Sequence, residues 1–192
     1  MKHIHFLFLL AALSCAKVKK QETKLSPNPE AILLNDSAFA LINSRNVEDY
    51  DKAIFLLDKA IEVDSGNWSI LHNKLIFQTN FKDYEKAIQT GKAILKIQHS
   101  FPDMYGTIGT FYLRIGNTIS ANRNYQQEIR MFDKFLDTMS LKNPNFDQMI
   151  LSKGTLLIMH GNEVEGNKML KELYDRQHNE MYKWAIEMVM YK

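Results

Sequence analysis

The hexapeptide DYDKAI at residues 49–54 returns as DYEKAI at residues 83–88, and a weaker copy, NTISA, occupies residues 117–121. The alanines of the three copies, Ala53, Ala87 and Ala121, follow one another at a constant spacing of 34 residues. A fixed period of roughly 20 to 50 residues is typical of solenoids built from like structural units. The repeat therefore predicts an array of such units, with the three alanines as its register.

Helix breakers are scarce along the chain, which has four prolines and eight glycines in 192 residues. Hydrophobic residues make up 45% and charged residues 24%, as in an ordinary folded protein. A sandwich or barrel would need many more turn signals. The composition therefore predicts an all-α fold.

The residue types at the repeated positions fit the packing of paired helices. Small residues are expected where two helices cross closely, and large residues fill the layer between neighbouring units, because one helix pair cannot bury its apolar face alone. The residues given this structural role are Tyr50, Ala53, Ala60, Tyr84, Ala87, Tyr105, Gly109, Tyr112, Ala121 and Tyr125.

In this order and spacing the residues resemble the tetratricopeptide repeat (TPR) family over about residues 34–175. The third unit carries the resemblance best, through Tyr105, Gly109, Tyr112, Ala121 and Tyr125. The resemblance implies a right-handed α–α superhelix, a TPR-like solenoid of about four helix pairs with a C-terminal capping helix. A Sel1-type repeat is the alternative, and the constant spacing of 34 residues disfavours it.

The predicted units span about residues 34–67, 68–101, 102–146 and 147–177, within a repeat domain of residues 28–192. Gly116 and Gly161 are 45 residues apart, so about 11 extra residues lie in the third unit, where they predict an extended second helix. Residues 178–192 are predicted to form the cap. An apolar stripe that includes Met181, Trp184 and Met188 lies on this helix, and its alternative role is contact with a partner.

The N-terminus has the layout of a secretory signal. Lys2 precedes an apolar run at residues 6–13, which is too short for a membrane span of roughly 20 residues. Ser14 and Cys15, the only cysteine of the chain, follow the run, and residues 12–15 resemble a bacterial lipobox. This resemblance implies a signal peptide at residues 1–14, acylation of Cys15 and a flexible tether over residues 15–27. An ordinary signal peptide with an incidental cysteine is the alternative.

The expected location is the bacterial cell envelope. A lipidated Cys15 would anchor the chain in a membrane, and Ala16 after it favours the outer membrane, facing the periplasm, by resemblance to lipoproteins. Beyond the lysines of residues 16–27 the chain is nearly neutral, with 19 basic and 21 acidic residues. It therefore lacks the basic face that binding of nucleic acid requires.

The resemblance also implies a ligand groove on the inner faces of the first helices of the pairs. Family positions transferred to this chain include Ala38 and Ile42 in unit one and Asp103 and Thr107 in unit three. These four residues exclude the carboxylate clamp known in some family members, and an extended or helical peptide fits better. The contact residues predicted here are Asn35, Arg45, His72, Asn73, Asn80 and Arg114, with solvated surface residues as the alternative interpretation.

Motifs that carry chemistry are absent from the sequence. It contains no His-Glu-x-x-His, Gly-x-Ser-x-Gly, phosphate loop or dinucleotide fingerprint. The cluster from His160 to Glu163 falls at a predicted turn, where glycine and polar residues are expected. We therefore expect no enzyme activity, no metal and no cofactor.

The sequence thus predicts a membrane-anchored scaffold that holds a protein or peptide partner in the groove. An immunity or inhibitor protein that neutralises one toxin or enzyme is the alternative function.

Overall fold

The structure is a computed structural model and describes residues 28–42, 47–99 and 102–190. The predicted signal peptide, Cys15, the tether and Arg45 lie outside the described residues. Within these ranges all regular structure is α-helical. The helices are α1 (Pro29–Ile42), α2 (Val47–Val63), α3 (Trp68–Asn80), α4 (Tyr84–Ile97), α5 (Pro102–Arg114), α6 (Thr118–Thr138), α7 (Phe146–Met159), α8 (Glu163–Arg176) and α9 (Glu180–Met190).

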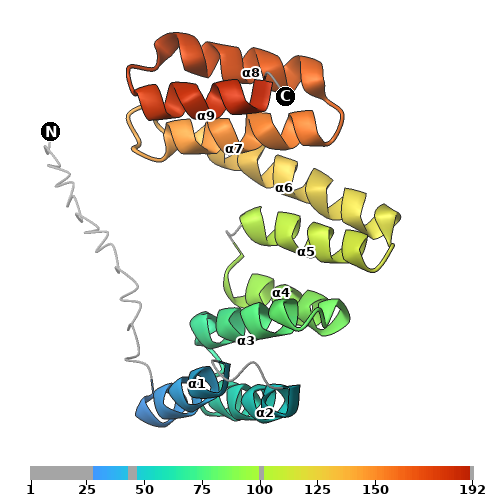
Figure 1. Ribbon diagram of the computed structural model, residues 1–192. Helices are drawn as coiled ribbons and strands as arrows, with labels where there is room; N and C mark the ends of the chain where they lie inside the picture. Colours follow the sequence, from blue (N-terminus) through green and yellow to red (C-terminus); the bar gives the residue numbers. More distant parts are fainter. Residues whose placement is uncertain (1–27, 43–46, 100–101, 191–192) are drawn as a thin grey trace, which may run out of the picture.

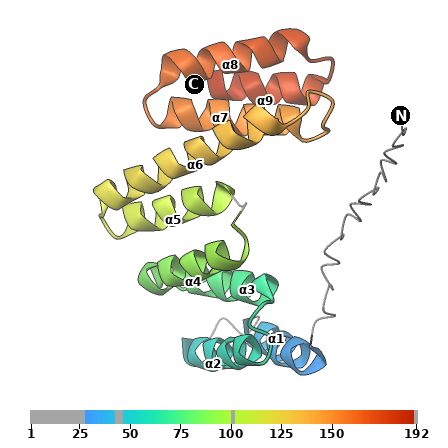
Figure 2. The same ribbon diagram turned by 180° about the vertical axis from the view of Figure 1, so that it is seen from behind.

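The helices stack as antiparallel pairs in chain order (Figures 1 and 2). The pairs are α1/α2, α3/α4, α5/α6 and α7/α8, and α9 packs against α8 at the end of the array. Each pair also contacts the next, through α2 with α3, α4 with α5 and α6 with α7. The all-α solenoid of helix pairs with a final capping helix is therefore confirmed.

The turn inside a pair has the same hydrogen-bonded form three times. Its residue with positive φ is Lys82 (φ 61°), Gly116 (φ 78°) or Gly161 (φ 86°). The amide of the next residue, Asp83 in the first case, donates to the carbonyl of Gln78 at 2.8 Å, and the two later turns have equivalent bonds of the same length. This helix-ending motif supplies hydrogen-bond donors to the last carbonyl groups of the first helix. The chain then turns back along that helix.

The register alanines lie at the closest packing positions of the second helices. Ala53 is 1% exposed, and Ala87 and Ala121 are fully buried. Gly109 of α5 faces the ring of Tyr125 on α6, and a Cβ atom at Gly109 would lie 2.7 Å from Cε1 of that ring. A large residue of one helix thus fills the space that a missing side chain leaves on the other.

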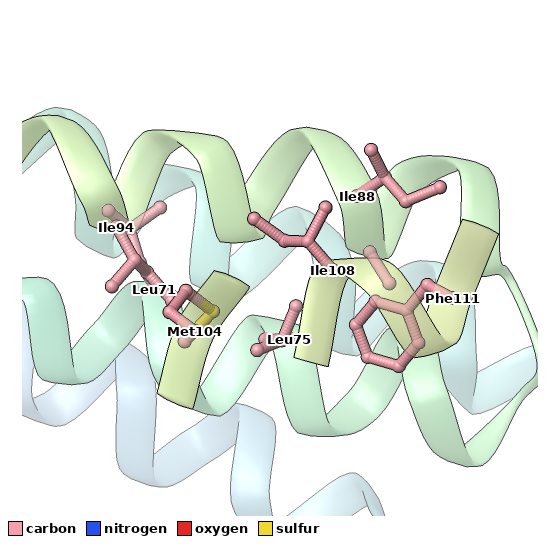
Figure 3. Packing of buried hydrophobic residues seen from close by; sticks show 8 residues of the cluster. Leu71, Leu75, Ile88, Ile94, Met104, Ile108 and Phe111 are labelled. Carbon is pink, nitrogen blue, oxygen red and sulfur yellow. The ribbon is translucent and has the colours of Figure 1, made fainter. Parts of the chain in front are cut away.

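The apolar core is divided into clusters along the array rather than gathered at one centre. The cluster shown in Figure 3 joins α3, α4 and α5 through residues such as Leu75, Ile94 and Ile108. A second cluster lies in α1, α2 and α3, and a third, around Leu170 and Ile186, lies in α7, α8 and α9. Each unit therefore buries its apolar face against its neighbours, as in other repeat arrays.

The first helix begins earlier than the 34-residue register predicts. The first residue of α3, Trp68, corresponds to residue 34, but α1 begins five residues before that, at Pro29. Ala38, which the transferred positions place on the groove, is fully buried in the cluster of α1, α2 and α3 instead, so that prediction is wrong.

Candidate functional site

A cavity of about 350 Å³ lies between α3 and α5, the first helices of the second and third pairs. We name it the α3–α5 cavity. Apolar side chains alternate with polar ones on its walls, and Ile76 is 38% exposed there. Its lining residues are His72, Leu75, Ile76, Thr79, Asn80, Asp103, Met104, Thr107 and Phe111.

A second cavity, of about 590 Å³, continues on the other side of α5. We name it the α5–α7 cavity, because α5 and α7 line it together with α6. Leu113, 45% exposed, contributes an apolar wall. The lining residues are Gly106, Thr110, Leu113, Arg114, Tyr125, Glu128, Leu156, Met159 and His160. Because α5 takes part in both cavities, they form consecutive sites along the first helices of the pairs.

The structure places the predicted contact residues in three positions. His72 and Asn80 line the α3–α5 cavity, and Arg114 lines the α5–α7 cavity. Asn73 lies outside both cavities, where its Nδ2 donates to Oδ1 of Asn35 at 2.8 Å and links α3 to α1. This bond uses one group of each amide. Asn80 and Arg114 are exposed, and the half-buried ring of His72 lies edge-on to Trp68, with the ring centroids 6.0 Å apart. Contact of these residues with a ligand stays a prediction.

Aromatic stacking shapes the α5–α7 cavity. The rings of Tyr125 and His160 stack with their centroids 3.8 Å apart and their planes at 28°. The Tyr125 hydroxyl lies 3.3 Å from Oγ1 of Thr110. Burial lowers the pKa of His160 below its ordinary value, because the charged form of the ring is costly away from water. The two stacked rings therefore give this part of the cavity a flat surface that favours the uncharged histidine.

Comparison with known proteins gives one sequence relative. The chain is 32% identical over 85 residues to the heat shock protein STI1 of Saccharomyces cerevisiae, which is 44% of this chain and 14% of that protein. The chain therefore spans about a seventh of the length of this relative. No protein-family profile matches the chain.

Several solved structures are similar to the chain at low sequence identity. A crystal structure of MamA has a TM-score of 0.49 at 17% identity and covers 77% of this chain and 79% of its own. The chaperone SycD of Yersinia enterocolitica has 0.49 at 13% identity, with 71% and 94% covered. A thermophilic TPR protein of Thermus thermophilus has 0.49 at 13% identity, with 83% and 80% covered.

The architecture of the chain itself decides the fold class, because helix pairs recur with alanines 34 residues apart and with the same turn inside the pair. The fold is of the tetratricopeptide-repeat type. In this TPR-type array, the two cavities lie between successive first helices, the helices on which the sequence predicts the ligand groove. The groove itself stays a prediction.

No group of three or more His, Cys, Asp or Glu residues is placed to hold a metal ion in the described part of the TPR-type array. Glu163, at the predicted turn with His160, lies in the first turn of α8 and is exposed. None of the described helices combines the length and the apolar character that a membrane crossing needs.

Glu128 is a charged residue of the site that the sequence prediction missed. It lies on α6 and is 7% exposed. A signal was present, because Glu128 continues the buried stripe of Ala121, Tyr125 and Phe132 at helical spacing. A carboxylate on a stripe that faces the core indicates either a buried partner or a functional role.

Proposed function

We propose that the chain is a protein-interaction module, which holds a segment of a partner protein along the α3–α5 and α5–α7 cavities. The observation that carries the proposal is the succession of two cavities along the array, with α5 shared between them. Isolated pockets would suit small ligands, whereas two consecutive sites suit a chain that continues from one into the other.

The linings support this kind of ligand. Ile76 and Leu113 present apolar surface to solvent, and Asn80 and Arg114 add polar groups at exposed positions. An extended segment offers backbone amides and carbonyls to the polar groups and side chains to the apolar walls. The role we propose is therefore binding without catalysis.

Photo-cross-linking tests the groove directly. A benzoyl-phenylalanine residue at position 76 or 113, in place of Ile76 or Leu113, should cross-link to the same partner protein. The same group in place of Lys96, which is exposed on α4 and lines neither cavity, serves as the control. Cross-linking from Lys96 alone would contradict the proposal.

Substitution of the polar residues gives the second arm of this test. The double variant Asn80→Ala/Arg114→Ala should lose most of the cross-linked product. The matched double variant Asn122→Ala/Arg123→Ala removes the same two side-chain types from exposed positions of α6. It should cross-link like the unaltered protein, and equal yields from both variants would reject these contacts.

We further propose that the module works in the bacterial cell envelope, anchored through a lipid on Cys15 and facing the periplasm from the outer membrane. The apolar run at residues 6–13 and the position of the single cysteine support this proposal. The variant Cys15→Ser should leave the membrane fraction for the soluble fraction. A Cys15→Ser variant that stays in the membrane fraction would contradict the proposed lipid anchor, and it would not affect the proposed groove.

A further inference from the structure

The carboxylate of Glu128 is largely buried, and one of its oxygens has no partner. Glu128 is 7% exposed, and its buried Oε2 atom has no hydrogen-bond partner. No ion pair involves this residue in the described part of the chain, and Arg114 of the same cavity is not within 4.0 Å of it. An ionised carboxylate in such surroundings is costly unless a cation or hydrogen-bond donors compensate it.

The neighbouring helix makes room for this carboxylate instead of compensating it. Gly106 of α5 faces Glu128, and a Cβ atom at Gly106 would lie 2.7 Å from Cδ of the carboxyl group. Burial, and then the negative charge of Asp103 on α5, raise the pKa of Glu128 to about 7. Gly106 therefore leaves space for the carboxyl group, and burial together with the charge of Asp103 makes a positive charge nearby favourable.

The cavity beside Glu128 has a volume and apolar lining residues that suit a long basic side chain. Leu113, Leu156 and Met159 give it apolar walls, and its volume is about 590 Å³. Lysine and arginine bury their aliphatic stems against apolar surface while the charged head reaches a polar group. The carboxylate of Glu128 lies where that head would need its counter-ion.

We infer that Glu128 anchors a lysine or arginine side chain of the partner segment in the α5–α7 cavity. The inference rests on the groove proposed above, and it adds the chemical class of the partner, a segment with a basic residue. An incoming cation supplies the missing charge, and the apolar walls take the stem. A pair formed with this largely buried carboxylate contributes more to affinity than a fully exposed ion pair.

Selection from a random peptide library tests the inference through the ligands that the protein itself selects. A phage-displayed library of 12-residue peptides is selected on the purified protein. Peptides that the Asn80→Ala/Arg114→Ala variant no longer binds are kept as groove ligands. We expect lysine or arginine at one position of these peptides far more often than in the unselected library.

The basic residue is then changed on the peptide, which leaves the protein fold untouched. Norleucine in place of the selected lysine keeps most of the stem and removes the charge. Fluorescence anisotropy should show at least ten-fold weaker binding of the norleucine peptide to the unaltered protein. The variant Glu128→Gln should bind both peptides with nearly equal affinity, because its anchor lacks the charge.

Asp137→Asn is the matched control, since it removes one carboxylate from an exposed position on the same helix. It should discriminate between the two peptides like the unaltered protein. If the groove ligands show no preference for a basic residue, and Glu128→Gln binds them as tightly as the unaltered protein does, the inference is wrong although the proposed groove stands. If no selected peptide depends on Asn80 and Arg114, the proposed groove itself fails.

Discussion

At the scale of single residues, Tyr50 links the first unit to the second. Its hydroxyl donates to Oδ2 of Asp83 at 2.9 Å, and Asp83 also accepts from Nζ of Lys86 at 2.9 Å. Burial would raise the pKa of the Asp83 carboxyl, but the hydrogen bonds from Lys86 and Tyr50 outweigh it and hold this pKa below its ordinary value. The Asp-Tyr pair of the repeated hexapeptide thus connects two units through the tyrosine of one and the aspartate of the next.

Removal of this hydroxyl tests the link. Tyr50→Phe should lower the free energy of unfolding by about 1–2 kcal/mol, because Asp83 loses a donor in a half-buried position. Tyr84→Phe is the matched control, since Tyr84 holds the same place one repeat later and no described residue hydrogen-bonds to its hydroxyl. Urea denaturation measures both variants, and equal losses would contradict the role of the Tyr50–Asp83 bond.

Glu128 gives a second prediction at this scale, which concerns pH. Its pKa is about 7 in the folded protein against 4.5 for an ordinary glutamate, so between these values the folded state keeps a proton that the unfolded state releases. Glu128 therefore lowers the free energy of unfolding as pH rises through this window, and the loss is complete above pH 7.

The variant Glu128→Gln cannot ionise and should escape this loss. It should gain stability relative to the unaltered protein by about 1–3 kcal/mol between pH 4.5 and pH 8. Thermal or urea unfolding at several pH values measures the difference, in which the contributions of all other titrating groups largely cancel. If the stability difference between the two proteins does not change with pH, the Glu128 carboxylate is stabilised as well in the folded state as in the unfolded state.

At the scale of elements, the crossing of α7 and α8 depends on two glycines. A Cβ atom at Gly166 would lie 2.7 Å from the carbonyl oxygen of Gly154, and one at Gly154 would lie 2.8 Å from Cγ of Leu170. A backbone oxygen cannot move away by a change of rotamer, as a side-chain atom can. The two helices would therefore have to move apart to accept any larger residue at Gly166.

Gly166→Ala should destabilise the protein by about 1–3 kcal/mol, although alanine favours an isolated helix over glycine. Gly66→Ala is the control, because nothing lies within 4 Å of a Cβ atom there. The control should change stability by less than about 1 kcal/mol, in either direction. The midpoints of urea denaturation measure the stability of both variants. An unchanged midpoint for Gly166→Ala would show that the helices do not cross as closely as described.

The sequence predicted some elements better than others for a physical reason. The second helices carry the repeated alanines, so α2, α4 and α6 could be placed from packing alone. The first helix has no such marker, and α1 begins at Pro29, five residues before the position that the register gives it. The transferred positions put Ala38 in the groove, although Ala38 is buried in the core.

At the scale of the whole molecule, the candidate site was predictable only as far as the repeat stays regular. Family positions carried by the 34-residue spacing reached the residues of α3 and α5 that line the cavities, such as His72 and Arg114. Between α5 and α7 the spacing grows to 45 residues with the longer α6. Glu128 and His160 lie beyond that break, so no transferred position pointed to them.

The same break divides the core. The clusters of α1–α3 and α3–α5 share Ile61 as a common neighbour, whereas none of the three clusters includes a residue of α6. In Figure 1, α6 leads from the lower pairs to the layer of α7, α8 and α9. Since repeat arrays unfold according to local stability and nearest-neighbour contacts, α7–α9 should open separately from α1–α5.

Hydrogen exchange followed by mass spectrometry can resolve this division. Leu170→Ala removes a fully buried side chain of the α7–α9 cluster and should cost about 2–5 kcal/mol locally. Exchange should become faster in α7, α8 and α9, with α3–α5 unchanged. Ile94→Ala, which empties an equally buried site of the α3–α5 cluster, should give the reverse pattern. If either variant accelerates exchange equally along the whole array, the molecule unfolds as one unit, because α6 would then transmit the loss from one cluster to the other.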